Sequence, residues 1–573
     1  MKTHDTLLNA ITLDAPWELV ELFAKTPRWQ PHDVNASADM IVSRLKALGV
    51  PVTVYEPEIY LSVPHTASVT MAGKTFHAKP PAYSVPTTGV TAEVVHVPAA
   101  YSASISKLFH RNQTVTDMTT LKGKIAISEG FAFPQKIREF EQAGAVGVIA
   151  VNPGIDVHWG ICTSIWGTPD LDDLPRKPGI PVVAVNNPDG NAIIAHAATG
   201  GAVTIAAHLE EGWFRQKVPV VDIRGAVEPE KFVLLHGHYD SWDVGVGDNA
   251  TGDATMLEVA RVLSAHAGQL RRSVRIAWWP GHSTGRYAGS TWFADHFALD
   301  LDANCVAQIN CDSPGCRWAS EFKDVSWTRE TETHAQAVIK AVTGLDAHGE
   351  RPHRAGDYSF NNIGISSLLM LSSTMPDALR AEKGYYTVGG CGGNIAWHTE
   401  NDTLEIADRQ ILLRDMKVYC EVVASIADAE VLPFDWRAQV SEFSETIAGY
   451  QAAAGDRFDF GPALAETAKL GAALAAFHAG IGSGQIAATT ANTVIQRLAR
   501  ILVPINYTSG PRFRHDPATP VSPLPTLAAA LQLQDADATR AGFVRTQLVR
   551  GQNRYIAALR EAEALVATAG ARH

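Results

Sequence analysis

Residues 231–240 read KFVLLHGHYD, a short apolar run that ends in two histidines and an aspartate. The run at 232–235 is typical of a buried strand, the pattern over 252–266 is helical, and 274–279 predicts a second strand. Apolar strands that alternate with helices favour a mainly parallel sheet, whose ligands collect at the carboxyl ends of the strands. We therefore expect an α/β fold with a site directly after residue 235.

Outward from this segment, the chain divides into four predicted parts. Residues 1–63 form an opening α/β unit, which 218–430 continue. Between them, residues 64–217 consist of short β-rich segments separated by Gly, Pro and Thr, and this change of composition indicates an inserted domain. Residues 431–573 are rich in Ala and Leu with helical spacing and predict a helical region.

The composition narrows the class of protein. The 573 residues are 46% hydrophobic and 19% charged, as in a globular chain. The net charge is −12 and no basic stripe is present, so we expect small molecules or proteins as partners, and neither nucleic acid nor a membrane. Six cysteines are too few for a secreted disulfide framework, and residues 1–22 lack a signal-peptide pattern. A cytoplasmic location is the default expectation.

Polar residues beside the predicted strands form a metal-ligand pattern. His238 and Asp240 follow the strand at 232–235, and Asp248 comes ten residues after His238. Asp312 follows a further apolar run, and His398 precedes a predicted helix. Imidazole and carboxylate groups can converge on one divalent ion, and Asp240 is placed to hold the His238 ring in one tautomer. A His-x-Asp pair alone fits a surface turn equally well, so the argument depends on the whole set.

With these residues the chain resembles the di-zinc aminopeptidase clan and, within it, the glutamate carboxypeptidase II and transferrin-receptor family. The matching motif is the Gly-His-x-Asp-Ser-Trp stretch at 237–242. The resemblance implies a site for one or two Zn²⁺ ions per chain, with a cis peptide between the shared Asp248 and Asn249. The implied ligands are His238, Asp248, Asp312 and His398.

The resemblance also covers the other parts of the chain. It implies an aminopeptidase-like, mainly parallel twisted sheet with helices on both faces for residues 1–63 and 218–430. Residues 64–217 correspond to a protease-associated (apical) domain. Residues 431–573 correspond to a helical dimerisation domain, so the resemblance implies a homodimer.

The pattern departs from the resembled family at residues 280–290, which read PGHSTGRYAGS. Peptidases of that family carry two successive glutamates here, the first a general base and the second a ligand of the second zinc. His282 stands at the base position and Ser283 at the ligand position, with the register uncertain by one residue because the loop is longer. A hydroxyl is a poorer zinc ligand than a carboxylate, so either His282 is the third ligand of the second site or that site is weak or empty.

An imidazole can also transfer protons near neutral pH, and we favour this role for His282 as the catalytic residue. The family's oxyanion-stabilising tyrosine is replaced by Trp397, whose indole is a donor only. Tyr386 is one candidate for the missing donor. Arg351 and Arg354 lie near the family's substrate-recognition positions, where an arginine can bind a carboxylate with two hydrogen bonds.

Three functions are compatible with these features. The first is a metal-dependent hydrolase of an amide-type C–N bond in a small substrate, with ordinary peptidase activity reduced by the loss of the glutamates. The second is a metal-dependent lyase or hydratase in which His282 is the acid or base. The third is a non-catalytic binding protein, as the transferrin receptor is, although that reading predicts erosion of the four metal ligands.

Overall fold

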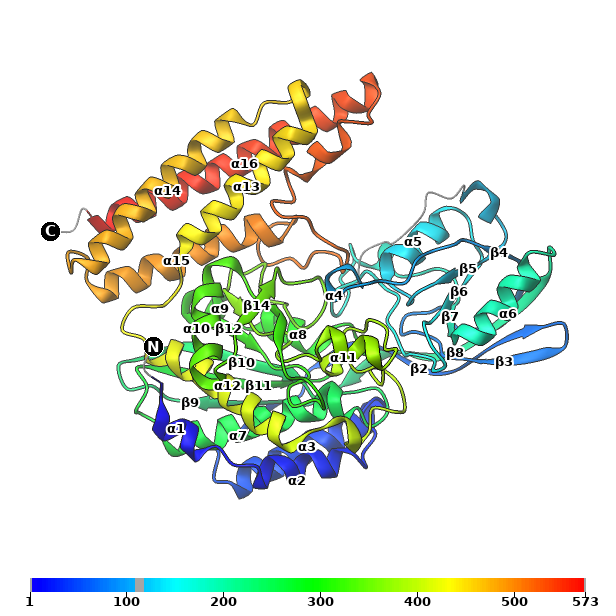
Figure 1. Cartoon of the computed structure of the whole chain (residues 1–573), viewed down its shortest axis with the longest axis horizontal. Coiled ribbons are helices and arrows are strands. Elements are labelled where there is room, and N and C mark those ends of the chain that lie inside the picture. Colours follow the sequence, from blue (N-terminus) through cyan, green and yellow to red (C-terminus); the bar gives the residue numbers. More distant parts are fainter. Residues whose placement is uncertain (1–2, 109–117, 571–573) are drawn as a thin grey trace.

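The computed structural model describes residues 3–108 and 118–570. Figure 1 shows three parts: a central α/β domain, a second sheet to its right, and a group of long helices above it. The second sheet is an insertion into the central domain, and the long helices form the C-terminal end of the chain. In the described residues, no helix is both long enough and apolar enough to cross a membrane.

The central domain is built on a six-stranded sheet in which four neighbouring strands are parallel, namely β11 (Arg272–Trp279), β10 (Glu228–His238), β12 (Cys305–Asn310) and β15 (Ser367–Leu368). Strands β9 (Val218–Ile223) and β1 (Thr53–Tyr55) complete one edge in antiparallel pairing. The predicted mainly parallel sheet is thus confirmed. In spatial order the strands are β1, β9, β11, β10, β12 and β15.

Helices cover both faces of this sheet, as predicted. One face is covered by α7 (Thr251–Ala265) and α12 (Arg409–Asp428), and the other by α8 (Ala288–His296) and α9 (Ala298–Asn304). Outside α7 and α12 lie α1 (Asp5–Ala10), α2 (Asp14–Phe23), α3 (Pro31–Ala47) and α10 (Glu332–Thr343). The remaining elements of this domain are β13 (Phe322–Ser326), β14 (Ala347–Glu350) and α11 (Asp377–Glu382).

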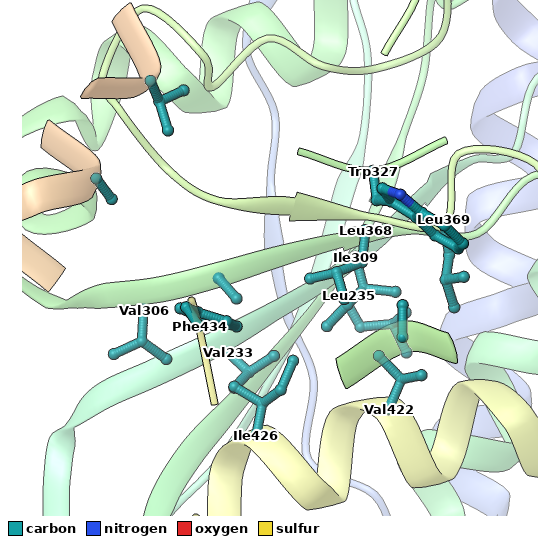
Figure 2. Close-up of a cluster of buried hydrophobic side chains, with 14 of the residues drawn as sticks. Val233, Leu235, Val306, Ile309, Trp327, Leu368, Leu369, Val422, Ile426 and Phe434 are labelled. Atoms are coloured by element: carbon teal, nitrogen blue, oxygen red, sulfur yellow. The ribbon is translucent and has the colours of Figure 1, made fainter. Parts of the chain in front are cut away.

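Side chains of β10 point alternately to the two faces of the sheet, and those on both faces are apolar. Val233 and Leu235 point toward α12, and Figure 2 shows them beside side chains of that helix. Phe232 and Leu234 belong to the apolar cluster on the opposite face. A strand buried on both sides reads as a continuous apolar run, which is the signal that marked 232–235 in the sequence.

The insertion forms a seven-stranded sheet. It contains the predicted parallel β-α-β unit, made by β5 (Ile125–Glu129), α5 (Pro134–Gln142) and β6 (Gly147–Val151). Strand β2 (Glu58–Met71) runs across residue 64, so the sheet begins before the predicted start of the insertion. Its strands are β3 (Lys74–Ala78), β2, β8 (Ala202–Arg215), β4 (Thr87–His96), β5, β6 and β7 (Val182–Val185). Its helices are α4 (Ile105–Leu108), α5 and α6 (Asn187–Ala197).

The C-terminal region is helical, as predicted. Its helices are α13 (Trp436–Ala454), α14 (Gly461–Gly482), α15 (Ala488–Tyr507) and α16 (Ala538–Gly570). Arg500 of α15 is buried and donates hydrogen bonds to the backbone carbonyls of Leu301, Cys305 and Gly364, which fixes this region to the central domain. Dimerisation through these helices stays a prediction.

Candidate metal centre

The predicted site residues come together at the carboxyl end of the parallel strands. His238 is the last residue of β10, and Asp312 lies two residues after β12. Asp248 lies in the short irregular segment before α7, and His398 in the loop that leads to α12. Gly237 permits this convergence, because a Cβ there would lie 2.5 Å from the carbonyl oxygen of Cys311.

Asp248 lies between two imidazoles. Its Oδ1 is 3.1 Å from His238 Nε2, and its Oδ2 is 3.2 Å from His398 Nε2. Asp312 Oδ2 is 3.6 Å from His238 Nε2 on the other side. The peptide bond between Asp248 and Asn249 is cis, as predicted.

The imidazoles are oriented by acceptors bound to their Nδ1 atoms. His238 Nδ1 donates to the carbonyl oxygen of Asp240 at 2.8 Å, and His398 Nδ1 donates to that of Trp159 at 3.1 Å. Because a carbonyl can only accept, each hydrogen bond fixes the proton on Nδ1 and leaves Nε2 facing Asp248. Metal-binding histidines are commonly held in this way.

The electrostatics of the cluster favour a bound cation. Burial opposes a charge on His238, but the carboxylates of Asp248 and Asp312 beside its Nε2 outweigh this effect and hold the pKa of His238 well above its ordinary value. Burial would raise the pKa of Asp248, yet the two imidazoles hold it well below its usual range. Among the described residues, the buried atoms His238 Nε2 and Asp248 Oδ1, which lie 3.1 Å apart, make no hydrogen bond of normal geometry. Nitrogen and carboxylate donors of this kind suit Zn²⁺, so these residues fit a divalent metal.

Asp240 differs from the prediction in the atom that it uses. Its carboxylate is 4.0 Å from His238 Nδ1, too far for a hydrogen bond, and its backbone carbonyl holds the ring instead. The carboxylate accepts the backbone N–H groups of His282 and Ser283, each at 3.0 Å. Asp240 therefore fixes the loop after β11 as well as the His238 ring.

His282 lies directly against the cluster. Its ring stacks on that of His238 with centroids 3.7 Å apart, and donor atoms of His238, His282 and Asp312 lie within 4.8 Å of one another. His282 Nδ1 is 2.8 Å from Asp357 Oδ2, so its Nε2 is the nitrogen available to the site. His282 thus groups with the predicted ligands of the first metal.

Asp357 is the partner that the sequence did not reveal for His282. It is fully buried, and its second oxygen accepts the hydroxyl of Ser290 at 2.6 Å. Burial would raise the pKa of Asp357, but the charge and hydrogen bond of His282, with a smaller contribution from Ser290, keep it below its ordinary value. Asp357 therefore accepts the Nδ1 proton as a carboxylate.

A cavity with about 690 Å³ of empty space, part of it open to solvent, adjoins the cluster. Asp248, His282, Asp312 and His398 line it together with Trp397. Most of the remaining wall is apolar and comes from Phe131, Ala132, Phe133, Trp159, Ile161, Ala355, Met370 and Leu371. Such a cavity suits a substrate with an apolar group beside the reacting bond.

Two residues of the cavity wall, Arg286 and Tyr287, were missed in the sequence. Arg286 lies in the glycine-containing loop after β11, where an arginine is more often a solvated charge. The Tyr287 hydroxyl accepts the N–H of Gly356 at 2.9 Å, and among the described residues its own proton has no acceptor. No sequence signal separates such residues from surface polar groups.

The predicted recognition residues lie elsewhere in the structure. Arg351 donates to the side chain and carbonyl of Asn506, and Arg354 donates to the carbonyl of Asp516. Neither lines the cavity beside the cluster. The Tyr386 hydroxyl is 2.7 Å from His158 Nε2, behind Trp397. A substrate role for these three residues stays a prediction.

Comparisons with known proteins agree with this architecture. Residues 220–423 match the model of peptidase family M28, and residues 90–193 match that of the PA domain. The chain therefore combines an M28 aminopeptidase-like fold with an inserted PA domain. A zinc aminopeptidase from Bacillus subtilis has a similar structure, with a TM-score of 0.54 and 20% identity, over 73% of this chain and 96% of that one.

The curated relatives match over shorter stretches. A probable glutamate carboxypeptidase VP8 of Zea mays is 25% identical over 236 residues, which are 39% of this chain and 32% of that protein. Aminopeptidase NAALADL1 of Mus musculus is 34% identical over 125 residues, 21% of this chain and 16% of that one. The chain thus matches a third or less of the length of these two relatives.

Proposed function

We propose that this chain is a metal-dependent hydrolase of an amide-type C–N bond in a small substrate. The observation that carries the proposal is the cluster of oriented imidazoles and carboxylates, in which His238 Nε2 and Asp248 Oδ1 are buried 3.1 Å apart and, among the described residues, make no hydrogen bond of normal geometry. Leaving such groups unpaired is costly, and a divalent cation offsets that cost. Relatives named aminopeptidase and glutamate carboxypeptidase support the reaction class.

The ligand assignment follows the cluster. His238, Asp248 and Asp312 would hold the first ion, and Asp248 with His398 a second, weaker one. Zn²⁺ suits these donors. When bound, such an ion supplies Lewis acidity, which polarises a substrate carbonyl and lowers the pKa of water. The replacement of two glutamates by His282 and Ser283 sets this site apart within the glutamate carboxypeptidase II and transferrin-receptor subfamily, to which we assign it.

His282 is the residue that moves the proton. Its Nε2 takes a proton from the attacking water and returns it to the leaving nitrogen, so that an amide and a water become a carboxylic acid and an amine. Asp357 binds Nδ1, keeps the ring in the tautomer that presents Nε2, and stabilises the imidazolium that forms. The stacking on His238 restricts the ring to one orientation.

The test combines turnover with metal content. Full-length protein loaded with zinc is assayed against aminoacyl anilides, dipeptides and N-acyl amino acids, before and after removal of the metal by a chelator. We expect turnover of some of these amides that is lost with the chelator and restored by zinc. No turnover of any amide by the loaded protein would refute the proposal.

The variant His282→Ala separates the two roles of this residue. We expect an unchanged zinc content and a rate lower by about 10²–10⁴-fold, the usual contribution of a general base. A lower zinc content would show instead that His282 is a ligand. Asp222→Ala, which removes an exposed carboxylate on β9, is the control for the loss of a side chain.

A further inference from the structure

Arg286 is a buried cation with few partners among the described residues, one of them the ring of Tyr287, whose centroid lies 5.5 Å from the guanidinium carbon. Its side chain is 4% exposed and lines the cavity beside the metal cluster. Among the described residues its guanidinium makes one long hydrogen bond, from Nη1 to the carbonyl oxygen of Ile161 at 3.5 Å, and no ion pair. In the same part of the chain its Nε has no acceptor. A guanidinium carries five N–H donors, so most of its hydrogen-bonding capacity is unused.

Two other buried arginines of this chain donate several hydrogen bonds to backbone carbonyls. Arg28 is fully buried and donates to the backbone carbonyls of Tyr239, Val244 and Gly245 at 2.7–3.0 Å. Arg500 is similarly surrounded by backbone carbonyls. The fold thus satisfies the guanidinium groups of Arg28 and Arg500. Arg286 differs from both, and it lines the cavity.

The surroundings of Arg286 define the ligand that it suits. Within the described residues that line the cavity, Arg286 is the one Lys or Arg side chain, and the rest of the wall is largely apolar. A single guanidinium matches a singly charged carboxylate, which it can bind through two parallel hydrogen bonds. The carbonyl of Arg286 accepts the N–H of Gly167 at 2.7 Å, so the insertion holds this part of the loop in place.

We propose that Arg286 binds a carboxylate of the substrate, so that the enzyme acts on amides that carry a free carboxylate next to an apolar group. Short peptides with a free C-terminus and N-acyl derivatives of apolar amino acids belong to this class. This inference rests on the proposed hydrolase function, because the cavity that Arg286 lines is the one that holds Asp248 and His282.

The test measures binding rather than turnover. The probes are 3-phenylpropanoate and its neutral amide, 3-phenylpropanamide, titrated by calorimetry into full-length, zinc-loaded protein. We expect the carboxylate to bind to the wild type and at least about 10-fold more weakly to Arg286→Met, since hydrogen bonds to charged groups contribute on this scale. The amide should bind both proteins alike. Arg286→Lys should recover part of the carboxylate affinity.

A control variant and a measurement of melting temperature complete the test. Arg545→Met removes an exposed positive charge on α16 and should leave both affinities unchanged. Without probe, Arg286→Met should melt no lower than the wild type, because the substitution removes a poorly partnered buried charge. Equal carboxylate affinity in wild type and Arg286→Met, or a large fall in melting temperature, would overturn the inference.

The binding test also separates this inference from the proposed function. If no amide were turned over but carboxylate binding still depended on Arg286, the hydrolase proposal would fail and the inference would stand. If amides were turned over but Arg286→Met left the preference for free carboxylates unchanged, the inference alone would fail.

Discussion

The pairing of His282 with Asp357 predicts the effect of the variant Asp357→Asn. The substitution keeps the size of the side chain but removes the charged acceptor that lies 2.8 Å from His282 Nδ1. A hydrogen bond to a charged group contributes about 1.5–3 kcal/mol, and 1.4 kcal/mol corresponds to tenfold. If this stabilisation acts on the imidazolium formed during proton transfer, kcat should fall about 10- to 100-fold while KM changes little.

A double-mutant cycle shows whether Asp357 acts through His282. In the background of His282→Gln, the further change Asp357→Asn should reduce kcat by less than about threefold, because the ring that it positions is gone. Ser290→Ala is the matched control, since it removes the other hydrogen bond to the same carboxylate and leaves the imidazole in place. Additive losses in the two backgrounds, with equal falls in melting temperature, would refute the positioning role.

Three further changes test other parts of the molecule. Burial raises the pKa of Glu330 from 4.5 to about 7, so the folded state binds the carboxyl proton more tightly than the unfolded state does. The stabilisation that this proton gives is complete below pH 4.5 and is lost as the pH rises through 7. Glu330→Gln should therefore stabilise the fold at pH 8, by up to about 3 kcal/mol, and have little effect at pH 5, as measured by melting curves. Asp402 accepts the backbone N–H groups of Gly247 and Asp248, so Asp402→Ala should weaken zinc binding about 10–100-fold in a competition with a chelating dye. Arg28→Ala leaves several buried carbonyls without donors and should lower the free energy of unfolding by at least about 3 kcal/mol in a denaturant titration.

The central sheet could be predicted because its strands are buried on both faces. Residues 232–235 therefore read as a continuous apolar run and 274–279 as a run interrupted by Arg275. The helical pattern between them completes the local signature of a parallel α/β unit. The start of the insertion was harder to place. Strand β2 runs from Glu58 to Met71, and its pairing with β8 shifts register at Pro64–Thr66, inside the strand. The predicted boundary at residue 64 therefore falls within the second sheet and not at its start.

The sequence indicates some residues of the candidate site more clearly than others. His238, Asp248, Asp312 and His398 could be singled out because each follows a strand or precedes a helix in a motif, and the structure brings them together. The partner of His282 could not, since Asp357 lies 75 residues further along the chain and the contact depends on tertiary packing.

The burial of a side chain, and the atom through which a residue binds its neighbour, could not be predicted from the sequence either. An arginine in a glycine-containing loop reads as a solvated charge, and only the packing around Arg286 reveals that it is enclosed. Asp240 was assigned to its neighbour His238 from spacing alone. Spacing does not distinguish a backbone carbonyl from a carboxylate, and here the carbonyl holds the ring while the carboxylate binds the 282–283 backbone.

The central claim is that the cluster around Asp248 holds a divalent metal, and metal analysis tests it most directly. Full-length protein is purified without chelator, supplied with zinc, dialysed, and its metal content measured by mass spectrometry beside Asp248→Ala and the exposed control Asp222→Ala. We predict at least one tightly bound zinc per chain in the wild type and in Asp222→Ala, and its loss in Asp248→Ala. A wild-type protein that retains no zinc, or an Asp248→Ala protein that retains as much as the wild type, would contradict this account.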